Sequence, residues 1–248
     1  MLVTQELTVK VDNKIIFDNV NLDFGPGIHI VMGPNGVGKS TFGHALMGNP
    51  NYDVEGAVQL NGKDLLAMET HERANAGLFL GFQTPTPIEG LSNMQFVKQF
   101  MGTRQNVGIN EIQKLLAEYK GHAEDFKLPA GFERNQLNVE ASGGEKKKSE
   151  IIQMLISNPT VAILDEPDSG LDIDAINELT FKLKRFMQSD PNKVLIIITH
   201  YEKLIEKLSP DTITVLRKDG ATTYEDITVA YDILENGFAD YEWCNIRS

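Results

Sequence analysis

Nine consecutive residues near the start of the chain have the composition of a phosphate-binding loop. They follow the spacing G-x-x-x-x-G-K-[ST] and read Gly33-Pro34-Asn35-Gly36-Val37-Gly38-Lys39-Ser40-Thr41. The glycines allow backbone N–H groups to curl around a phosphate without Cβ clashes. In such a loop Lys39 is expected to reach the β- and γ-phosphates, and Ser40 to hold Mg²⁺. These residues predict a site for a nucleoside triphosphate.

Acidic and imidazole side chains follow two other apolar runs. Asp165 and Glu166 come directly after Thr160 to Leu164, and His200 follows Val194 to Ile198 and Thr199. Ligands of open α/β sheets bind at the carboxyl ends of the strands, which is also where the phosphate-binding loop lies. We therefore expect Asp165 to hold Mg²⁺, Glu166 to polarise the attacking water and His200 to contact the γ-phosphate. The alternative for His200 is a packed or surface histidine.

A second anion site is predicted at Ser142-Gly143-Gly144, where a helix begins and presents its positive end. The next residues are Glu145 and three lysines, Lys146 to Lys148, and these lysines oppose the helix dipole. On their own they are equally well explained as a solvated face. We call the loop of residues 33–41 and the segment Ser142-Gly143-Gly144 the first and second cradle. One nucleotide needs only one cradle, so the presence of two predicts that two copies of the chain clamp nucleotides between them.

Several elements must position these groups. Fully apolar strands alternate with helices, a pattern that predicts an α/β fold with a mostly parallel sheet covered on both faces. Residues 2–24 contain short apolar runs separated by turns and predict antiparallel strands at the sheet edge. The other predicted strands are His29–Met32, Val54–Leu60, Gly77–Phe82, Thr160–Leu164 and Val194–Ile198, and the predicted helices are Phe42–Met47, Glu69–Ala76, Ser142 to about Ser157, and Asp172–Met187.

The pattern changes after Gln83. A loop containing two prolines spans residues 84–90, and helical periodicity follows in 93–101 and 110–120. No strand signal follows until well past Leu137. The sequence therefore predicts a nucleotide-binding core formed by residues 1–88 and 139–248, with an inserted helical subdomain at 89–138.

Composition narrows the classes of partner. The 248 residues carry a net charge of -12 and a pI of about 4.9, which argues against nucleic acid or an anionic membrane as the main partner. No apolar run approaches the ~20 residues of a membrane span, and no secretory signal is visible. The single cysteine, Cys244, excludes an internal disulfide and a cysteine-only metal cage within one chain; it is expected to be a tail residue. These features favour a cytoplasmic protein. No role is assigned to the other four histidines, because none of them directly follows an apolar strand as His200 does. They are His29, His44, His71 and His122.

The order and spacing of the motifs resemble those of the ATP-binding cassette superfamily. The matching segments are Gly33–Thr41, Gln83, Ser142-Gly143-Gly144-Glu145, Ile163-Leu164-Asp165-Glu166, Ser169-Gly170-Leu171-Asp172 and His200. The resemblance implies a P-loop NTPase fold with a RecA-like core and a Mg²⁺-dependent ATPase. It adds Gln83 as a catalytic residue and a metal ligand, beside the catalytic Lys39, Glu166 and His200. It also implies that Ser142 and Gly144 of one copy face the ATP of the other.

Within the superfamily the chain resembles the SufC family, the ATPases of the SUF iron–sulfur cluster assembly machinery. The resemblance rests on the segments Ser142–Met154, Asp168–Ala175, Ile198–Tyr201 and Leu234–Phe238, with Trp243 beyond. It implies the scaffold proteins SufB and SufD as partners, and we expect them to bind the segment Thr84–Phe100. Val11 falls where the superfamily has an aromatic residue that stacks on adenine, so recognition of the base is expected to be weak.

Two other roles remain open at this point. The nucleotide-binding subunit of a membrane importer or exporter would carry the same core motifs and differ only in its partner. The other is a non-transport regulatory or DNA-repair cassette protein. Such repair ATPases usually place long coiled coils between the phosphate-binding loop and Ser142, where this chain has only residues 89–138, and the acidity of the chain further disfavours DNA.

Overall fold

Apolar strands form the centre of a six-stranded sheet in the computed structural model, which describes residues 1–102 and 108–241. The strand order is β12-β11-β3-β10-β9-β6, and every neighbouring pair is parallel except β11 and β12. The predicted α/β class and mostly parallel sheet are confirmed. The strands are β3 (Gly27–Met32), β6 (Leu78–Gly81), β9 (Val161–Asp165), β10 (Val194–Ile198), β11 (Thr212–Arg217) and β12 (Gly220–Tyr224).

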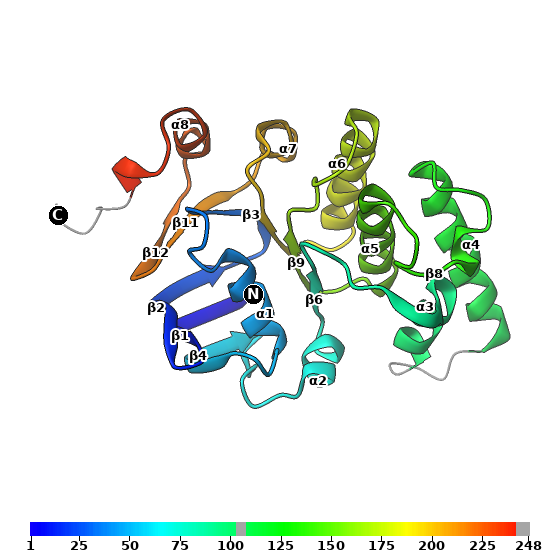
Figure 1. Ribbon diagram of the computed structural model, residues 1–248, viewed down its shortest axis with the longest axis horizontal. Coiled ribbons are helices and arrows are strands. Elements are labelled where there is room, and N and C mark those ends of the chain that lie inside the picture. Colours follow the sequence, from blue (N-terminus) through cyan, green and yellow to red (C-terminus); the bar gives the residue numbers. More distant parts are fainter. Residues whose placement is uncertain (103–107, 242–248) are drawn as a thin grey trace.

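Both faces of this sheet are buried, which explains why its central strands are apolar throughout. Ala162 and Leu164 of β9 pack into the core cluster on one face, and Val161 and Ile163 into the cluster on the other. Helices α5 to α8 lie along one face, and α1 lies on the other (Figure 1). The bounds of these helices are α1 (Lys39–Met47), α5 (Gly143–Ser157), α6 (Ile173–Gln188), α7 (Glu202–Leu208) and α8 (Thr228–Asn236).

A second, four-stranded antiparallel sheet has the order β2-β1-β4-β5. The antiparallel pairing predicted for residues 2–24 is confirmed, but its place at the edge of the parallel sheet is wrong. Strand β1 gains β4 as its second neighbour, so these strands form a sheet of their own, joined to the parallel sheet by a hydrogen bond from Asp18 N to Lys218 O (2.8 Å). The antiparallel edge strand is β12. The second sheet comprises β1 (Leu2–Val11), β2 (Lys14–Phe24), β4 (Asp53–Leu60) and β5 (Lys63–Asp64).

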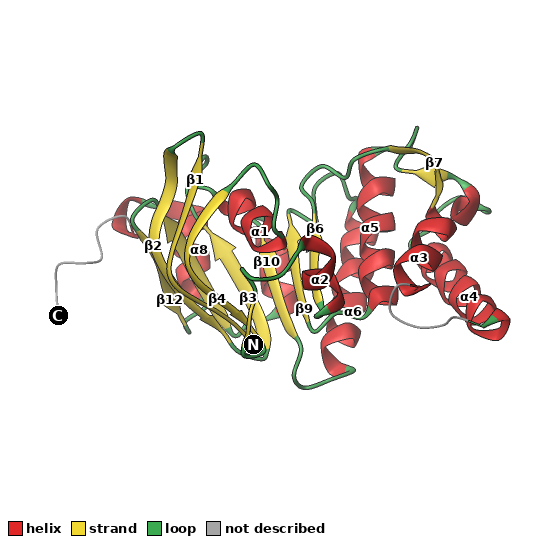
Figure 2. Ribbon diagram, turned by 90° about the horizontal axis from the view of Figure 1, so that it is seen from below, coloured by secondary structure: helices red, strands yellow, loops and turns green. Residues whose placement is uncertain are grey.

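The helical part lies at the end of the molecule opposite the antiparallel sheet (Figures 1 and 2). Both predicted helices are present as α3 (Asn93–Gly102) and α4 (Ile109–Asp125), and they pack against α5. The expectation of no strand in this stretch is wrong, because β7 (Ile88–Ser92) pairs with β8 (Gln136–Leu137). The boundaries 89 and 138 of the inserted subdomain stay a prediction.

No helix or strand was predicted after His200, where the structure adds α7, β11, β12, α8 and the short helix η2 (Ala239–Tyr241). Two further short helices are α2 (Thr70–Asn75), as predicted, and η1 (Phe132–Arg134). Among the helices of residues 1–102 and 108–241, none has the length and apolar composition that crossing a membrane requires. Trp243 and Cys244 lie outside the described residues.

Gly56→Ala should lower the free energy of unfolding by ~2 kcal/mol. Gly56 has φ +102°, and a Cβ there would lie 2.5 Å from the carbonyl oxygen of Glu6 in the neighbouring strand. The matched control is Gly62→Ala, which has φ +78° but nothing within 4 Å of the added Cβ. Urea unfolding followed by circular dichroism measures both. Equal losses in the two variants would show that the close approach to Glu6 contributes nothing.

Candidate nucleotide site

Four strands of the parallel sheet end at a common edge. In the strand register Ile198 of β10 lies opposite both Val31 of β3 and Asp165 of β9, and Leu164 lies opposite Gly81 of β6. The residues that follow these strands are therefore neighbours. The structure brings together the start of the phosphate-binding loop, the Asp165–Glu166 pair, Thr199 with His200, and Gln83.

The phosphate-binding loop connects β3 to α1 and needs its glycines for two reasons. Gly36 and Gly38 have φ +76° and +104°, which favour glycine. A Cβ on Gly38 would also lie 2.7 Å from Ile16 Cγ2 and 2.8 Å from Phe17 Cδ1. The first turn of α1 carries no acidic residue. Its backbone N–H groups and positive dipole end therefore suit an anion.

Lys39 is folded into this loop. Its Nζ donates to the carbonyl oxygens of Gly33 (2.7 Å) and Pro34 (3.1 Å), and the residue is only 9 % exposed. Burial lowers the pKa of its ammonium, an effect that the negative charges of Glu166 and Asp165 oppose. The ammonium is thus held by two neutral acceptors inside the loop, which phosphate oxygens can replace with stronger, charge-assisted hydrogen bonds.

The two carboxylates at the end of β9 have different environments. Asp165 is buried, and burial raises the pKa of its carboxyl while a hydrogen bond from Ser40 lowers it. Glu166 is half-buried with φ +46°, and its Oε2 accepts a hydrogen bond from Gln83 Nε2 (2.9 Å). A glutamate in the left-handed region is strained, as is often found at functional sites.

These side chains fit a magnesium ion. Asp165, Ser40 and Gln83 offer a carboxylate, a hydroxyl and an amide oxygen, and hard oxygen donors are what Mg²⁺ prefers. Mg²⁺ is commonly bound through one or two protein groups, with water and substrate phosphates completing its coordination. The donor set suits an ion that arrives with a nucleotide.

His200 follows β10 at this edge of the sheet. Its Nε2 is buried and has no hydrogen-bond partner among the described residues. Burial lowers the pKa of the imidazole, and the positive charge of Lys39 lowers it further, while Glu166 and Asp168 oppose the shift. A neutral imidazole with an unpaired nitrogen beside Lys39 is suited to contact a phosphate oxygen.

Sequence reasoning missed three residues that hold this edge together. Asp168 accepts a hydrogen bond from Thr199 Oγ1 (2.7 Å) and so ties the segment after Glu166 to the end of β10. Lys147 belongs to the run Lys146 to Lys148, for which a solvated face is one of the two explanations from sequence, yet it is only 3 % exposed, and Glu150 beside it is 6 % exposed. The signal was available in the helical period, because residues 147, 150, 151 and 154 lie on one face.

The second predicted cradle forms a helix cap. Ser142 Oγ accepts from Glu145 N (3.2 Å), and the Glu145 carboxylate accepts from the backbone N of Ser142 (2.8 Å). The Glu145 carboxylate also accepts a hydrogen bond from Ser142 Oγ (2.8 Å), and the two hydrogen bonds that it accepts from Ser142 lower the pKa of Glu145. Ser142 and Gly143 are exposed, whereas a Cβ on Gly144 would lie 2.8 Å from the Gly170 carbonyl oxygen. In the described residues, no hydrogen bond joins this cradle to the phosphate-binding loop.

Comparison with known proteins shows the family to which the chain belongs. The family model described as ABC transporter matches residues 17–169. The chain is 38% identical over 245 residues to Vegetative protein 296 of Bacillus subtilis, covering 98% of this chain and 92% of that protein. It is 36% identical over 247 residues to the probable ATP-dependent transporter SufC of Escherichia coli, covering 96% and 97%.

Solved structures share the fold at lower identity. A dimeric ATP-binding cassette in a post-hydrolysis state, bound to ADP and Pi, matches with a TM-score of 0.76 at 21% identity, covering 91% of this chain and 98% of that one. The ATP-binding subunit of an ABC transporter matches with a TM-score of 0.77 at 19% identity, covering 95% and 100%. The chain therefore belongs to the ABC transporter family, and it is an ATPase that binds and hydrolyses ATP.

Proposed function

We propose that this ATPase drives iron–sulfur cluster assembly in the cytoplasm as the ATP-hydrolysing subunit of a SUF-type complex with SufB and SufD. The observation that carries the proposal is the 36% identity to SufC of Escherichia coli, which extends over nearly the full length of both chains. The cluster is cargo held by the scaffold proteins, and this chain supplies the movement that reshapes them.

In the proposed mechanism, the chain binds and orients the reacting groups. The backbone N–H groups of residues 33–41 and the ammonium of Lys39 hold the phosphates. Ser40, Asp165 and Gln83 would hold Mg²⁺, and the charge of the ion would neutralise phosphate oxygens. Glu166 accepts a hydrogen bond from the attacking water and polarises it, and His200 Nε2 contacts the γ-phosphate. Because phosphoryl transfer depends mostly on positioning and charge stabilisation, these contacts are what one copy of the chain contributes to the reaction.

Hydrolysis is proposed to occur between two copies of the chain. The exposed Ser142 and the backbone of Gly143 and Gly144 supply the second cradle, which contacts the ATP held by the loop of the other copy. The Ser142 hydroxyl then exchanges its Glu145 contact for a phosphate oxygen. The two anion sites that the sequence predicts, and the exposure of Ser142 and Gly143 at the second, support this arrangement. The isolated chain should therefore hydrolyse ATP slowly at low concentration and faster as it dimerises.

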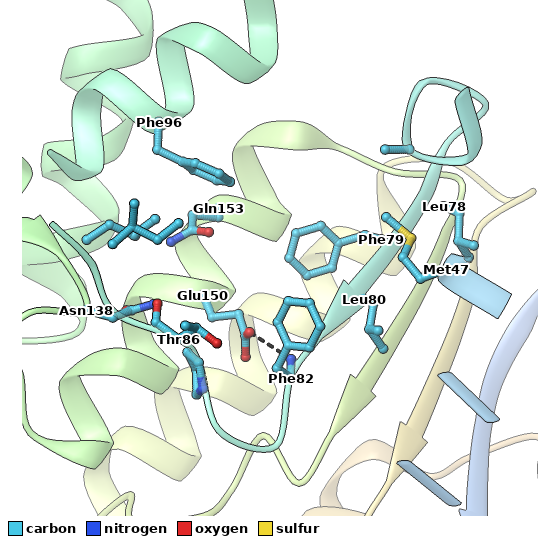
Figure 3. A pocket seen from close by; sticks show the side chains of 14 residues that line it. Met47, Leu78, Phe79, Leu80, Phe82, Thr86, Phe96, Asn138, Glu150 and Gln153 are labelled. Carbon is cyan, nitrogen blue, oxygen red and sulfur yellow. Dashed lines mark hydrogen bonds between the residues drawn. The ribbon is translucent and has the colours of Figure 1, made fainter. Parts of the chain in front are cut away.

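A groove beside Gln83 is the proposed docking surface for the scaffold. This groove, of about 270 Å³, lies between β6, β7 and α3 and is mostly apolar (Figure 3). Phe82 and Ile88 in its wall are 40% and 42% exposed. Phe82 directly precedes Gln83, so a partner that presses on the groove can move the Gln83–Glu166 contact. Part of the expected segment Thr84–Phe100 lines the groove, including Pro85, Thr86, Ile88 and Phe96.

Purification of the tagged chain from its own host without detergent tests the proposed role. Soluble SufB and SufD should co-purify, and addition of ATP and Mg²⁺ should make that complex more compact in small-angle scattering. Recovery from the membrane pellet with polytopic subunits would instead identify the nucleotide-binding subunit of a transporter. The printed description of the relative, a probable ATP-dependent transporter, is the observation that favours this second candidate.

Ile88→Glu should weaken binding of the chain to the scaffold by at least about 10-fold, because a charge is placed in an apolar contact. Basal ATP hydrolysis should stay unchanged, since Ile88 lies outside the nucleotide site. Phe181→Glu, on the 54% exposed side chain of α6, is the matched control and should bind normally. Titration of labelled variants against purified scaffold measures both. Equal affinity of the two variants would place the docking surface elsewhere.

A further inference from the structure

The buried cation of α5 contacts the backbone directly before two proposed catalytic side chains. Lys147 Nζ donates to the carbonyl oxygen of Phe82 (2.6 Å) and to that of Asp165 (2.7 Å). Each carbonyl belongs to the peptide bond that leads into the next residue, Gln83 in one case and Glu166 in the other. One ammonium therefore fixes the relative position of the ends of β6 and β9.

We propose that Lys147 is a positioning residue for ATP hydrolysis, which sets the separation between Gln83 and Glu166 by holding the peptide groups that precede them. The two side chains meet through the hydrogen bond from Gln83 Nε2 to Glu166 Oε2. A shift of either strand end would change the place of the carboxylate that polarises the water. Errors of this kind reduce catalysis far more than they reduce binding.

Glu150 completes the arrangement from the same helix face. Its carboxylate accepts a hydrogen bond from the backbone N of Phe82 (2.7 Å) and lies 3.9 Å from the Lys147 ammonium. The pair thus holds both the N–H and the C=O of Phe82, and Figure 3 shows Glu150 beside Phe82 in the wall of the apolar groove. The donor and acceptor therefore fix the orientation of Phe82 as well as its distance from Asp165.

The Lys147–Glu150 pair is buried, so a purely stabilising role explains it poorly. A buried ion pair is often no more stabilising than apolar side chains of the same volume, because both charges lose their hydration. Apolar residues at 147 and 150 would suit a helix that packs on a sheet. What apolar residues cannot supply is a charged donor shared by two carbonyls and an acceptor for one N–H. The pair is thus explained by what it holds in place.

Lys147→Met tests the proposal, because methionine has a similar length and no charge. We expect kcat for ATP hydrolysis to fall by about 10- to 100-fold, while the Kd for ATP, which depends on the loop of residues 33–41, stays within about twofold. Lys146→Met and Lys148→Met, on the more exposed neighbours, are the matched controls and should retain wild-type kcat. A folded Lys147→Met protein with wild-type kcat, or one in which only the melting temperature falls, would overturn the proposal.

Glu150→Gln is the second variant if Lys147→Met does not fold. It keeps an acceptor for the Phe82 N–H and removes only the counter-charge of Lys147. We expect a loss in kcat of several fold with an unchanged Kd for ATP, and an unchanged kcat would count against the positioning role.

A double variant separates positioning from a general effect on the fold. In single-turnover assays Lys147→Met should cause little further loss when Glu166 is already glutamine, because both changes act on the same group. Multiplying losses would indicate that Lys147 acts independently of Glu166, and the proposal would be wrong. Since Glu166→Gln alone tests the proposed role of Glu166, and no scaffold protein is present in these assays, failure of this inference is distinguishable from failure of the proposed function.

Discussion

Glu166→Gln should reduce ATP turnover by on the order of 10²- to 10⁴-fold while leaving ATP binding intact. The amide has nearly the shape of the carboxylate, and its oxygen can still accept the hydrogen bond that Gln83 Nε2 now donates to Glu166 Oε2 over 2.9 Å. The backbone is also held independently of the side chain, since Glu166 N donates to Ile198 O (2.9 Å). What the amide loses is the negative charge that polarises water.

The same variant should accumulate as a dimer that holds ATP, because the step that opens the proposed two-copy site no longer occurs. Single-turnover hydrolysis, equilibrium binding of labelled ATP and size-exclusion chromatography with MgATP measure the three properties. Glu202→Gln, an exposed carboxylate at the start of α7 just after His200, is the control and should behave as the wild type. Wild-type turnover in Glu166→Gln would show that another group polarises the water.

The parallel sheet was predictable because its strands are buried on both faces. The five consecutive aliphatic residues Val194 to Ile198 predict a central strand. The run lies between Pro191 and Thr199, so it is too short for a buried helix. The pair β7 and β8 shows the opposite case. Ile88–Ser92 contains Glu89 and Gly90 and is largely exposed, so its strand conformation comes from pairing with a segment more than forty residues away. Local pattern carries no signal of such pairing.

The site was predictable to the extent that its chemistry lies in contiguous motifs. The order of Gly33–Thr41, Asp165–Glu166 and His200 along the chain, combined with the rule that strand ends share an edge, placed these groups together. The support beneath them was not predictable in this way. Lys147 resembles its neighbours Lys146 and Lys148 in type. The helical period places it on the buried face of α5, but no motif indicates that its ammonium binds the carbonyl oxygens of Phe82 and Asp165.

The wrong prediction that residues 2–24 lie at the edge of the parallel sheet is explained by a glycine conformation and by strand register. Residues 2–24 have the composition of edge strands, and the sequence does not state that β4 will pair with β1. That pairing depends on Gly56 and on the register shift between Gln5 and Thr8, which lets β1 curve between β2 and β4. The antiparallel strands therefore close into their own sheet over α1, and the core between the two sheets holds the phosphate-binding loop against Ile16 and Phe17.

Lys39→Ala should abolish ATP hydrolysis and weaken ATP binding by about 100-fold or more, because two charge-assisted hydrogen bonds of about 1.5–3 kcal/mol each are lost. The ammonium is the positive charge inside the loop, and the carbonyls of Gly33 and Pro34 that it now satisfies would also lose their donor. The fold itself should survive, since the loop is at the edge of the sheet and Phe42, Ala45 and Leu46 still anchor α1 in the core.

Titration with a fluorescent ATP analogue and a phosphate-release assay measure the two losses, with Lys63→Ala on the exposed strand β5 as the control. The pair of variants at Lys39 and Glu166 separates the two halves of the reaction, because the first prevents ATP from binding and the second prevents bound ATP from reacting. If Lys39→Ala bound and hydrolysed ATP normally, the loop would not be the phosphate site. Loss of ATP binding in Lys39→Ala would assign binding to the loop that follows β3. Loss of turnover alone in Glu166→Gln would assign the reaction of bound ATP to the end of β9.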